Sequence, residues 1–153
     1  MLASTMRTSL LAAVLLAACG GSSPATIETT QFNPSLQVDL KSSAKLAGGM
    51  YYRDFVVGTG APVAAGQLVK VHYVGSLPNG SQFDGNTGSD TPFQFHLGAG
   101  EVITGWDEGL AGVTVGSNRQ LIIPPSLGYG SFEVPGIPAN SILVFNVVII
   151  SAE

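Results

Sequence analysis

Hydrophobic and polar residues alternate in short runs over most of the chain after its first third, and glycine and proline separate the runs. In one run, Val69, Val71 and Tyr73 share one face while Lys70 and His72 share the other. A period of two residues predicts a half-buried β-strand. Further strands are predicted at residues 51–57, 81–84, 93–97, 118–123 and 142–151.

One segment has helical spacing instead. Ile103, Trp106 and Leu110 are spaced three and four residues apart, which predicts a short amphipathic helix with Asp107 and Glu108 on its solvated face. The sequence therefore predicts an α+β fold, in which an antiparallel sheet of five to six strands wraps around one short helix. Trp106, as the largest apolar side chain of that helix, is expected to fill the space between helix and sheet.

The first residues have the pattern of an export signal. Residues 1–18 combine Arg7 with an apolar run from Leu10 to Ala18, which is typical of a signal peptide and too short to span a bilayer. The run ends in Leu16-Ala17-Ala18-Cys19, which resembles a bacterial lipobox, where cleavage before the cysteine precedes attachment of lipid. This pattern predicts an exported lipoprotein anchored to a membrane through Cys19, on the periplasmic side of the outer membrane if the host has one. The alternative is an ordinary signal peptide in which Cys19 is incidental.

The next segment, residues 19–48, is expected to be a lipid-anchored flexible tether. It opens with Gly20-Gly21-Ser22-Ser23-Pro24 and has little periodicity afterwards, apart from some alternation in residues 32–40. The folded domain is placed at residues 49–153, with its core in 66–153.

Composition limits the chemistry. The chain is 45% hydrophobic and 10% charged, with one cysteine and two histidines. So few cysteine and histidine residues argue against a zinc site and against a Ser/His/Asp or Cys/His catalytic centre. No metal and no cofactor is expected. The six basic residues are scattered along the chain, which argues against nucleic-acid binding. His72 and His96 are expected on the solvent side of their strands.

Six strings of the domain resemble, in order and spacing, those of the FKBP family of peptidyl-prolyl cis-trans isomerases. They are Val71–Gly75, Gly80–Asp84, Pro92–Gly98, Val102–Leu110, Leu127–Gly130 and Ile137–Phe145. The resemblance covers about residues 50–153 and implies an FKBP-like fold. Some positions depart from the family pattern. Val134 stands where many members have histidine, the stretch 135–138 is one residue shorter, and Asn146 replaces an aspartate and is expected to face away from the pocket.

The resemblance also implies a proline-binding pocket. Its substrate-binding residues are Tyr73, Phe83, Phe93, Val102, Trp106 and Phe145. Three further residues are implied to act on the amide itself. The backbone N–H of Ile103 holds the substrate carbonyl, the Tyr129 hydroxyl donates a second hydrogen bond, and Asp84 lies near the carbonyl carbon or orients its neighbours. The implied partners are proline-containing unfolded or exported polypeptides, with macrolide inhibitors as candidate ligands.

Other interpretations stay open at this point. The aromatic residues can be core alone, as is expected for Phe95, and Asp84 can be a turn residue before Gly85-Asn86. A chaperone that binds clients without turnover uses the same fold, although the loop at 130–141 is short. A structural surface lipoprotein is a third class. Because no helical arm precedes the domain, a monomer is expected.

Overall fold

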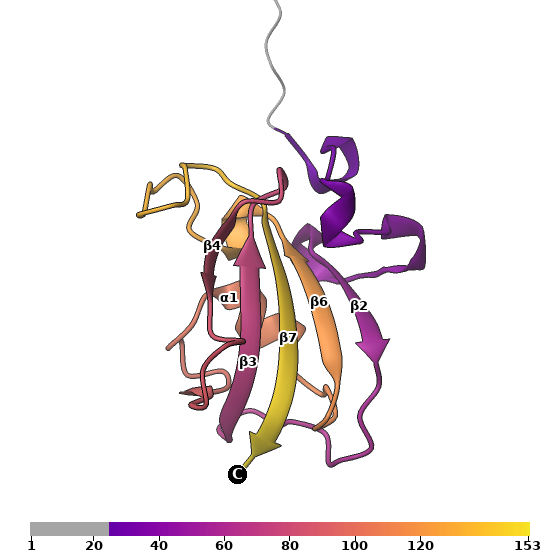
Figure 1. Ribbon diagram of the computed structural model, residues 1–153, viewed down its shortest axis with the longest axis vertical. Helices are drawn as coiled ribbons and strands as arrows, with labels where there is room; N and C mark the ends of the chain where they lie inside the picture. The colour runs from indigo at the N-terminus through magenta and orange to yellow at the C-terminus, as the bar shows by residue number, and fades with distance from the viewer. Residues whose placement is uncertain (1–24) are drawn as a thin grey trace, which may run out of the picture.

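The computed structural model describes residues 25–153, in which a curved antiparallel sheet wraps around one short helix (Figure 1). The predicted fold class is confirmed. The strands follow the order β1-β2-β6-β7-β3-β4, and β5 also pairs with β3. Their bounds are β1 (Ala44–Lys45), β2 (Tyr51–Val56), β3 (Leu68–Ser76), β4 (Gln82–Gly85), β5 (Phe93–His96), β6 (Asn118–Ile123) and β7 (Leu143–Ala152).

The helical elements are short. The α-helix α1 covers Thr104–Gly109, one residue less at each end than the spacing of Ile103, Trp106 and Leu110 predicts. The remaining helical turns are of the 3-10 type: η1 (Ile27–Thr29), η2 (Pro34–Leu36), η3 (Leu40–Ser42), η4 (Ala47–Gly49) and η5 (Pro125–Leu127).

Strand β7 divides its side chains between two faces of the sheet. Phe145 and Val147 are buried on the inner face, toward α1, in the main core. Val144 is buried on the outer face. Asn146 also points outward, where its Oδ1 accepts a hydrogen bond from Gln120 Nε2 at 3.1 Å. The expectation that Asn146 faces away from the pocket is confirmed.

Two glycines let α1 approach the sheet closely. A Cβ atom on Gly105 would lie 2.6 Å from Ile123 Cγ2, and one on Gly109 would lie 2.5 Å from Met50 Cε. Side-chain carbons do not approach that closely, so a larger residue at either position would push the helix away from β6. Trp106 lies between these glycines and is buried, with 4% of its surface exposed.

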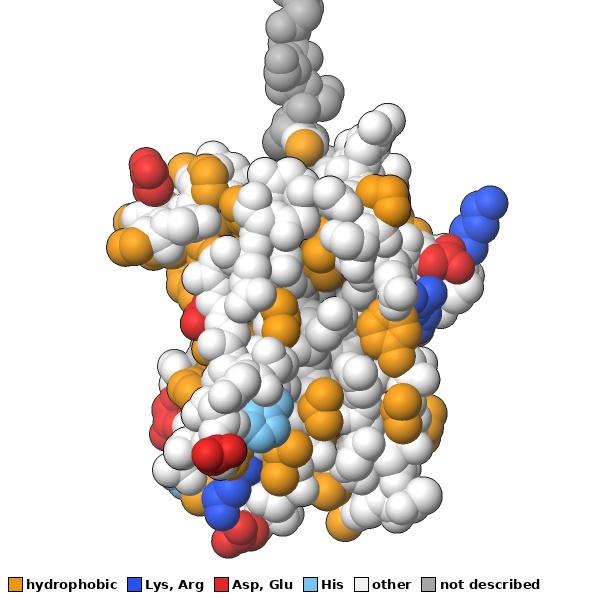
Figure 2. All heavy atoms as spheres, viewed as in Figure 1, with side chains coloured by type: hydrophobic (Ala, Val, Ile, Leu, Met, Phe, Trp, Pro, Cys, Tyr) orange, Lys and Arg blue, Asp and Glu red, His pale blue; other side chains and the backbone are white. Residues whose placement is uncertain are grey.

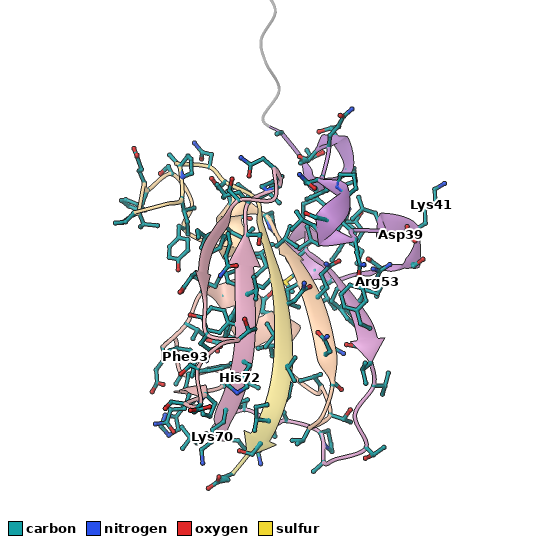
Figure 3. The ribbon with its side chains drawn as sticks, viewed as in Figure 1. Asp39, Lys41, Arg53, Lys70, His72 and Phe93 are labelled. Carbon is teal, nitrogen blue, oxygen red and sulfur yellow. The ribbon has the colours of Figure 1, made fainter. Side chains whose placement is uncertain are left out.

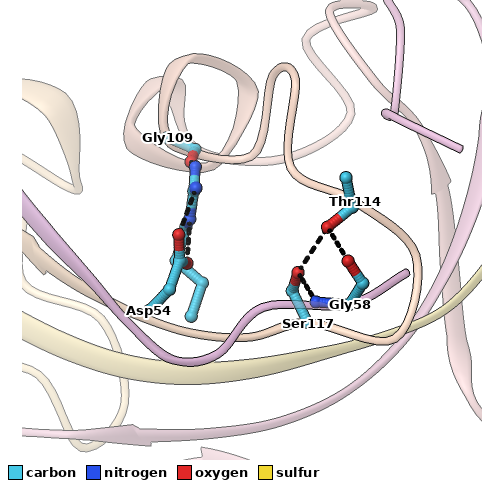
Figure 4. Close-up of polar contacts among 6 residues, drawn as sticks. Asp54, Gly58, Gly109, Thr114 and Ser117 are labelled. Atoms are coloured by element: carbon cyan, nitrogen blue, oxygen red, sulfur yellow. Dashed lines mark hydrogen bonds and ion pairs between the residues drawn. The ribbon is translucent and has the colours of Figure 1, made fainter. Parts of the chain in front are cut away.

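Arg119 on β6 fixes the end of the helix to the edge of the sheet (Figure 4). Its Nε and Nη2 donate to the two carboxylate oxygens of Asp54 at 2.6 and 2.8 Å, while Nη1 donates to the Gly109 carbonyl at 2.9 Å. Close by, the Thr114 hydroxyl donates to the Gly58 carbonyl at 2.8 Å. A bidentate, half-buried guanidinium of this kind positions its partners in both distance and orientation.

The flexible tether predicted for residues 19–48 is wrong for the part that the structure describes. Residues 25–49, called the N-terminal extension below, form four 3-10 turns and strand β1. Figure 1 shows the extension lying beside the upper ends of β6 and β2. Ile27 and Leu36 are buried in a second apolar cluster with Ile122 and Val144. The extension therefore covers apolar residues on the outer face of the sheet.

Polar contacts also hold the extension in place. The Leu36 carbonyl accepts a hydrogen bond from buried Gln120 Nε2 at 2.7 Å. The Asn33 amide donates to the Pro78 carbonyl at 2.8 Å. Irregular 3-10 turns have neither a two-residue nor a 3.6-residue apolar period, so hydrophobic periodicity did not reveal this segment.

The predicted signal segment, Cys19 and the glycine-serine run that follows lie outside the described residues. Within residues 25–153, no helix is long and apolar enough to cross a bilayer. The same part of the chain contains no group of three or more His, Cys, Asp and Glu side chains arranged to hold a metal ion.

If the extension is part of the folded body, Leu36→Ala lowers the free energy of unfolding by about 2 kcal/mol or more, because it leaves a cavity in the outer cluster. Ser35→Ala, which changes the neighbouring exposed side chain, is the matched control and has a small effect. Denaturation by urea, followed by circular dichroism, measures both. If the two variants have equal free energies of unfolding, the extension does not contribute to the folded body and acts as a tether.

Candidate functional site

A cavity of about 370 Å³ opens between α1, the inner face of β3 and the loop that carries Tyr129. Its lining residues are Tyr73, Asp84, Phe93, Gly100, Glu101, Val102, Ile103, Trp106, Tyr129 and Phe145. The cavity lining thus includes every predicted pocket residue except Phe83, while the predicted lipidation site, Cys19, lies outside the described residues. Gly100 and Glu101 are lining residues that the sequence reasoning missed.

Trp106 forms the floor of this cavity and is ringed by other aromatic side chains. Its ring centroid lies 5.1 Å from that of Tyr73, 5.3 Å from Phe145 and 6.1 Å from Phe93, each at an edge-to-face angle. Such pairs contribute beyond the area they bury. Trp106 Nε1 is buried and has no hydrogen-bond partner in residues 25–153. The floor is therefore aromatic, with the indole N–H as a polar group that has no partner in the described part of the chain.

Two further phenylalanines pack against the aromatic side chains of the pocket. Phe95 is 1% exposed and packs on Trp106 with ring centroids 5.5 Å apart, so its prediction as core is confirmed. Phe83 packs edge-to-face on Phe145 at 5.5 Å. Its ring also lies over Gly75, where an added Cβ would come within 2.7 Å. Phe83 is not among the residues that line the cavity, and it contacts the pocket wall through Phe145; its predicted role in binding substrate stays a prediction.

Asp84 and Tyr73 form a hydrogen-bonded pair at the pocket wall. The Tyr73 hydroxyl donates to Asp84 Oδ2 at 2.7 Å, and the Gly85 amide donates to Asp84 Oδ1 at 2.8 Å. Burial, and then the hydrogen bond to Asp84, raises the pKa of Tyr73 well above its usual value. Burial, and then the negative charge of Asp84, also raises the pKa of Tyr129. Both phenols are therefore neutral donors at physiological pH.

Two donors at the pocket are left free by the fold. In the described part of the chain, the N–H of Ile103 and the hydroxyl of Tyr129 take part in no intramolecular hydrogen bond. Ile103 directly precedes α1 in an extended conformation. Both groups are available to donate a hydrogen bond to a carbonyl in the cavity. This is the role that the family resemblance implies for each of them.

Carboxylates hold the segment between β5 and α1. Asp107 accepts hydrogen bonds from the amides of Gly98 at 2.8 Å and Gly100 at 3.2 Å. Asp107 was predicted to be a solvated residue, which is wrong because it fixes backbone that lines the pocket. Glu101 accepts from the His96 amide at 2.9 Å and contacts His96 Nδ1 at 3.0 Å. These contacts with His96 lower the pKa of Glu101.

The two histidines remain outside the site. His96 is exposed, as predicted, whereas His72 is half-buried with an Nδ1 that has no partner among the described residues. Neither lines the cavity.

Comparison with known proteins agrees with this geometry. A family model described as FKBP-type peptidyl-prolyl cis-trans isomerase matches residues 60–150. The chain belongs to this family. FK506-binding protein 4 of Mycosarcoma maydis is 50% identical over 112 residues, which cover 73% of this chain and 30% of that protein. A peptidyl-prolyl cis-trans isomerase of Saccharomyces cerevisiae is 49% identical over 111 residues, with 72% and 27% covered.

The chain thus spans less than a third of the length of the curated FKBP relatives that it matches. Solved structures of the family match it more completely. AtFKBP13 superposes with a TM-score of 0.68 at 36% identity, covering 72% of this chain and 98% of that one. FkpA from Escherichia coli gives a TM-score of 0.68 at 37% identity, covering 74% and 52%.

The Tyr73–Asp84 pair predicts that the Tyr73 phenol ionises at a higher pH than free tyrosine does. Because folding raises the pKa of Tyr73 above 10.0, its neutral phenol contributes stability that is complete below pH 10 and is lost as the pH rises through the raised pKa. In an absorbance titration of phenolate, Tyr73→Phe removes a step more alkaline than that of free tyrosine. Asp84→Asn moves that step to lower pH. If Tyr73→Phe instead removes a titration step at the pH of free tyrosine, the pairing of Tyr73 with Asp84 is contradicted.

Proposed function

We propose that the cavity above Trp106 catalyses cis–trans isomerisation of X-Pro bonds in polypeptides. The observation that carries the proposal is a preformed aromatic cavity with an unpaired N–H, that of Ile103, in its lining. Membership of the FKBP family supports it. A proline ring is the apolar group that such a cavity accommodates, and a carbonyl is the acceptor that the free N–H requires.

The reaction needs little more than such an environment. Resonance gives the peptide C–N bond a rotation barrier of about 18–20 kcal/mol, and uncatalysed X-Pro isomerisation takes tens to hundreds of seconds. When the amide twists, it loses resonance and its carbonyl becomes less polar. Water stabilises the planar, polar amide better than the twisted one, so an apolar cavity lowers the barrier by favouring the twisted state.

The residues divide this task between them. Trp106 contacts the proline ring, with Tyr73, Phe93 and Phe145 as walls. The Ile103 N–H and the Tyr129 hydroxyl donate to substrate carbonyls and hold the bond for rotation. Asp84 fixes the Tyr73 ring through its hydroxyl. No covalent bond is made or broken in the reaction, so no nucleophile or general base takes part.

The hydroxyl of Tyr129 is expected to contribute to the rate. Tyr129→Phe lowers kcat/KM on a short X-Pro peptide about three- to tenfold, which is the effect of one hydrogen bond of ordinary strength. Tyr52→Phe removes the same atom from a ring that lies under Arg119, away from the pocket, and leaves the rate unchanged. A protease-coupled isomerisation assay measures both variants.

The assay also tests the alternative of a client-binding module. A folded protein that binds proline peptides but has no turnover in the wild type would overturn the catalytic proposal. Equal losses in the two tyrosine variants would instead remove Tyr129 from the mechanism.

The cellular setting is also a proposal. We infer an exported monomer that acts on proline-containing unfolded or exported polypeptides and is anchored through lipid on Cys19. The lipobox-like run before Cys19 supports the anchor. The described part of the chain has its first element, η1, at Ile27. The eight residues from Cys19 to Ile27 span at most about 28 Å, which is less than the span of a flexible tether from Cys19 to residue 48. The names of the fungal relatives say that they bind FK506, which supports a macrolide ligand for this pocket.

The anchor is tested by expression in a bacterium with lipoprotein-processing enzymes. The wild-type chain is expected to lose residues 1–18, to gain the mass of acyl chains and to fractionate with membranes. Cys19→Ser is expected to keep its leader or to be released without lipid. Cleavage of the wild type without any acyl mass would favour the ordinary signal peptide.

A further inference from the structure

Beyond Tyr129, the chain forms a compact loop, residues 130–140, that projects from the body of the molecule at the upper left of Figure 1. Its neck is closed by a hydrogen bond from the Asn140 amide to the Gly130 carbonyl at 2.8 Å. Farther out, Val134 and Ile137 pair with each other through two backbone bonds of 3.1 and 2.9 Å. Gly136 turns the chain between them with a φ of 81°. The loop is therefore preformed.

This loop borders a second cavity, of about 630 Å³, which we call the flank groove. Its lining residues are Leu77, Glu133, Val134, Pro135, Gly136, Ile137 and Pro138. Apart from one carboxylate, that lining is apolar. Phe132, next to the lining, is 76% exposed. Figure 2 shows hydrophobic side chains gathered on the projecting lobe at the upper left, with an acidic group at its tip.

The flank groove and the proline pocket share no lining residue, but their walls are in contact at two places. Tyr129 lines the pocket, and its carbonyl accepts a hydrogen bond from the Phe132 amide at 3.2 Å. On the other side, Gly136 lies against Phe83, where an added Cβ would be 3.5 Å from Phe83 Cβ. Phe83 in turn supports Phe145, a wall of the pocket. These contacts place the flank groove next to the walls of the pocket.

The charges of the protein are unevenly distributed along the described part of the chain, and three carboxylates, those of Asp84, Glu101 and Glu133, line the two cavities. Within residues 25–153, every Lys and Arg except Lys41 is ion-paired with an acidic residue, Glu28, Asp39, Asp54 or Glu153. The acidic residues without a Lys or Arg partner all fall within one part of the sequence. They are Asp84, Asp90, Glu101, Asp107, Glu108 and Glu133.

That part of the sequence builds the pocket and the flank groove. Among residues 71–153, Arg119 is the one Lys or Arg, and it is paired with Asp54. Figure 3 shows Phe93, from the pocket, on the opposite side of the molecule from Lys41 and Arg53, whereas Lys70, which is paired with Glu153, lies on the same side as Phe93. Uncompensated charge of one sign around a cavity concentrates ligands of the opposite sign.

We propose that the flank groove binds the residues next to X-Pro in the substrate and favours segments that carry an apolar residue and a Lys or Arg there. Phe132 supplies apolar contact, and the carboxylates around the two cavities attract the cation. The inference rests on the proposed isomerase function. A second copy of this chain would bring like charges together, and anionic lipid would be repelled, so neither fits this surface as well.

The test compares matched peptides on the wild-type protein. One is a short X-Pro tetrapeptide, and the others extend it by about five residues on each side, which reach roughly 17 Å when extended. The extensions carry one Phe and either Lys, Gln or Glu. At low ionic strength, kcat/KM for the Lys peptide is expected to exceed that for the Glu peptide about two- to fivefold. The ratio narrows as salt is added.

Variants locate the effect. Phe132→Ser is expected to lower the kcat/KM of the long Gln peptide relative to that of the tetrapeptide. Glu133→Gln is expected to lower the kcat/KM of the Lys peptide relative to that of the Glu peptide. Val57→Ser, at an apolar residue that is 70% exposed on another surface, and Glu153→Gln, at the carboxylate paired with Lys70, are the matched controls and change neither ratio.

The outcomes separate the two proposals. If the tetrapeptide is not isomerised, the proposed function itself fails. If it is isomerised but all the long peptides match it at every salt concentration, the flank groove is overturned and the pocket stands. A change in self-association or in vesicle binding upon Phe132→Ser, without a change in either ratio, would assign this surface to a second copy or to lipid and also overturn the proposal.

Discussion

The packing of Trp106 against a ring of aromatic side chains is the interaction on which the structure of the site depends. One indole is at once the largest side chain of α1, a part of the core and the floor of the pocket. Its edge-to-face contacts with Tyr73 and Phe145 join the helix to two different strands. These contacts are reached only because Gly105 and Gly109 bring the helix against the sheet. The hydrophobic core and the binding site therefore share the same cluster of aromatic side chains.

The polar groups around this cluster are arranged to leave little freedom. Arg119 fixes the end of α1 to β2, and Asp107 fixes the backbone that precedes the helix. In consequence the Ile103 N–H is held at the pocket without an internal partner. An unsatisfied donor beside an apolar cavity is costly in a folded protein unless a ligand or water uses it. The same rigidity that stabilises the fold thus prepares the site for a carbonyl.

Much of this could be predicted from the sequence, because the responsible forces are local. Alternation along β3 and β7 identified their buried faces, and the spacing of Ile103 and Trp106 identified the helix. The family strings then pointed to most of the pocket. The strand pattern alone does not show that Phe83 packs edge-to-face on Phe145, or which of the two rings lines the cavity.

The remaining errors have a common cause in contacts between distant segments. The role of Asp107 depends on where the Gly98 and Gly100 amides lie in space. The N-terminal extension has no regular period, and it is ordered by burial of Ile27 and Leu36 on the outer face of a sheet formed much later in the chain. A segment with low periodicity and many small residues is a linker only where the folded domain offers no apolar surface on which it can pack.

The most direct test of the central claim uses Trp106 as a probe, since it is the one tryptophan of the chain. Emission is followed while an X-Pro peptide is added, and isomerisation is measured over the same concentrations. If the peptide binds above the indole, the emission changes saturably, with a midpoint equal to the concentration that half-saturates turnover. Turnover that saturates while the emission stays constant would place the reaction elsewhere and contradict the account.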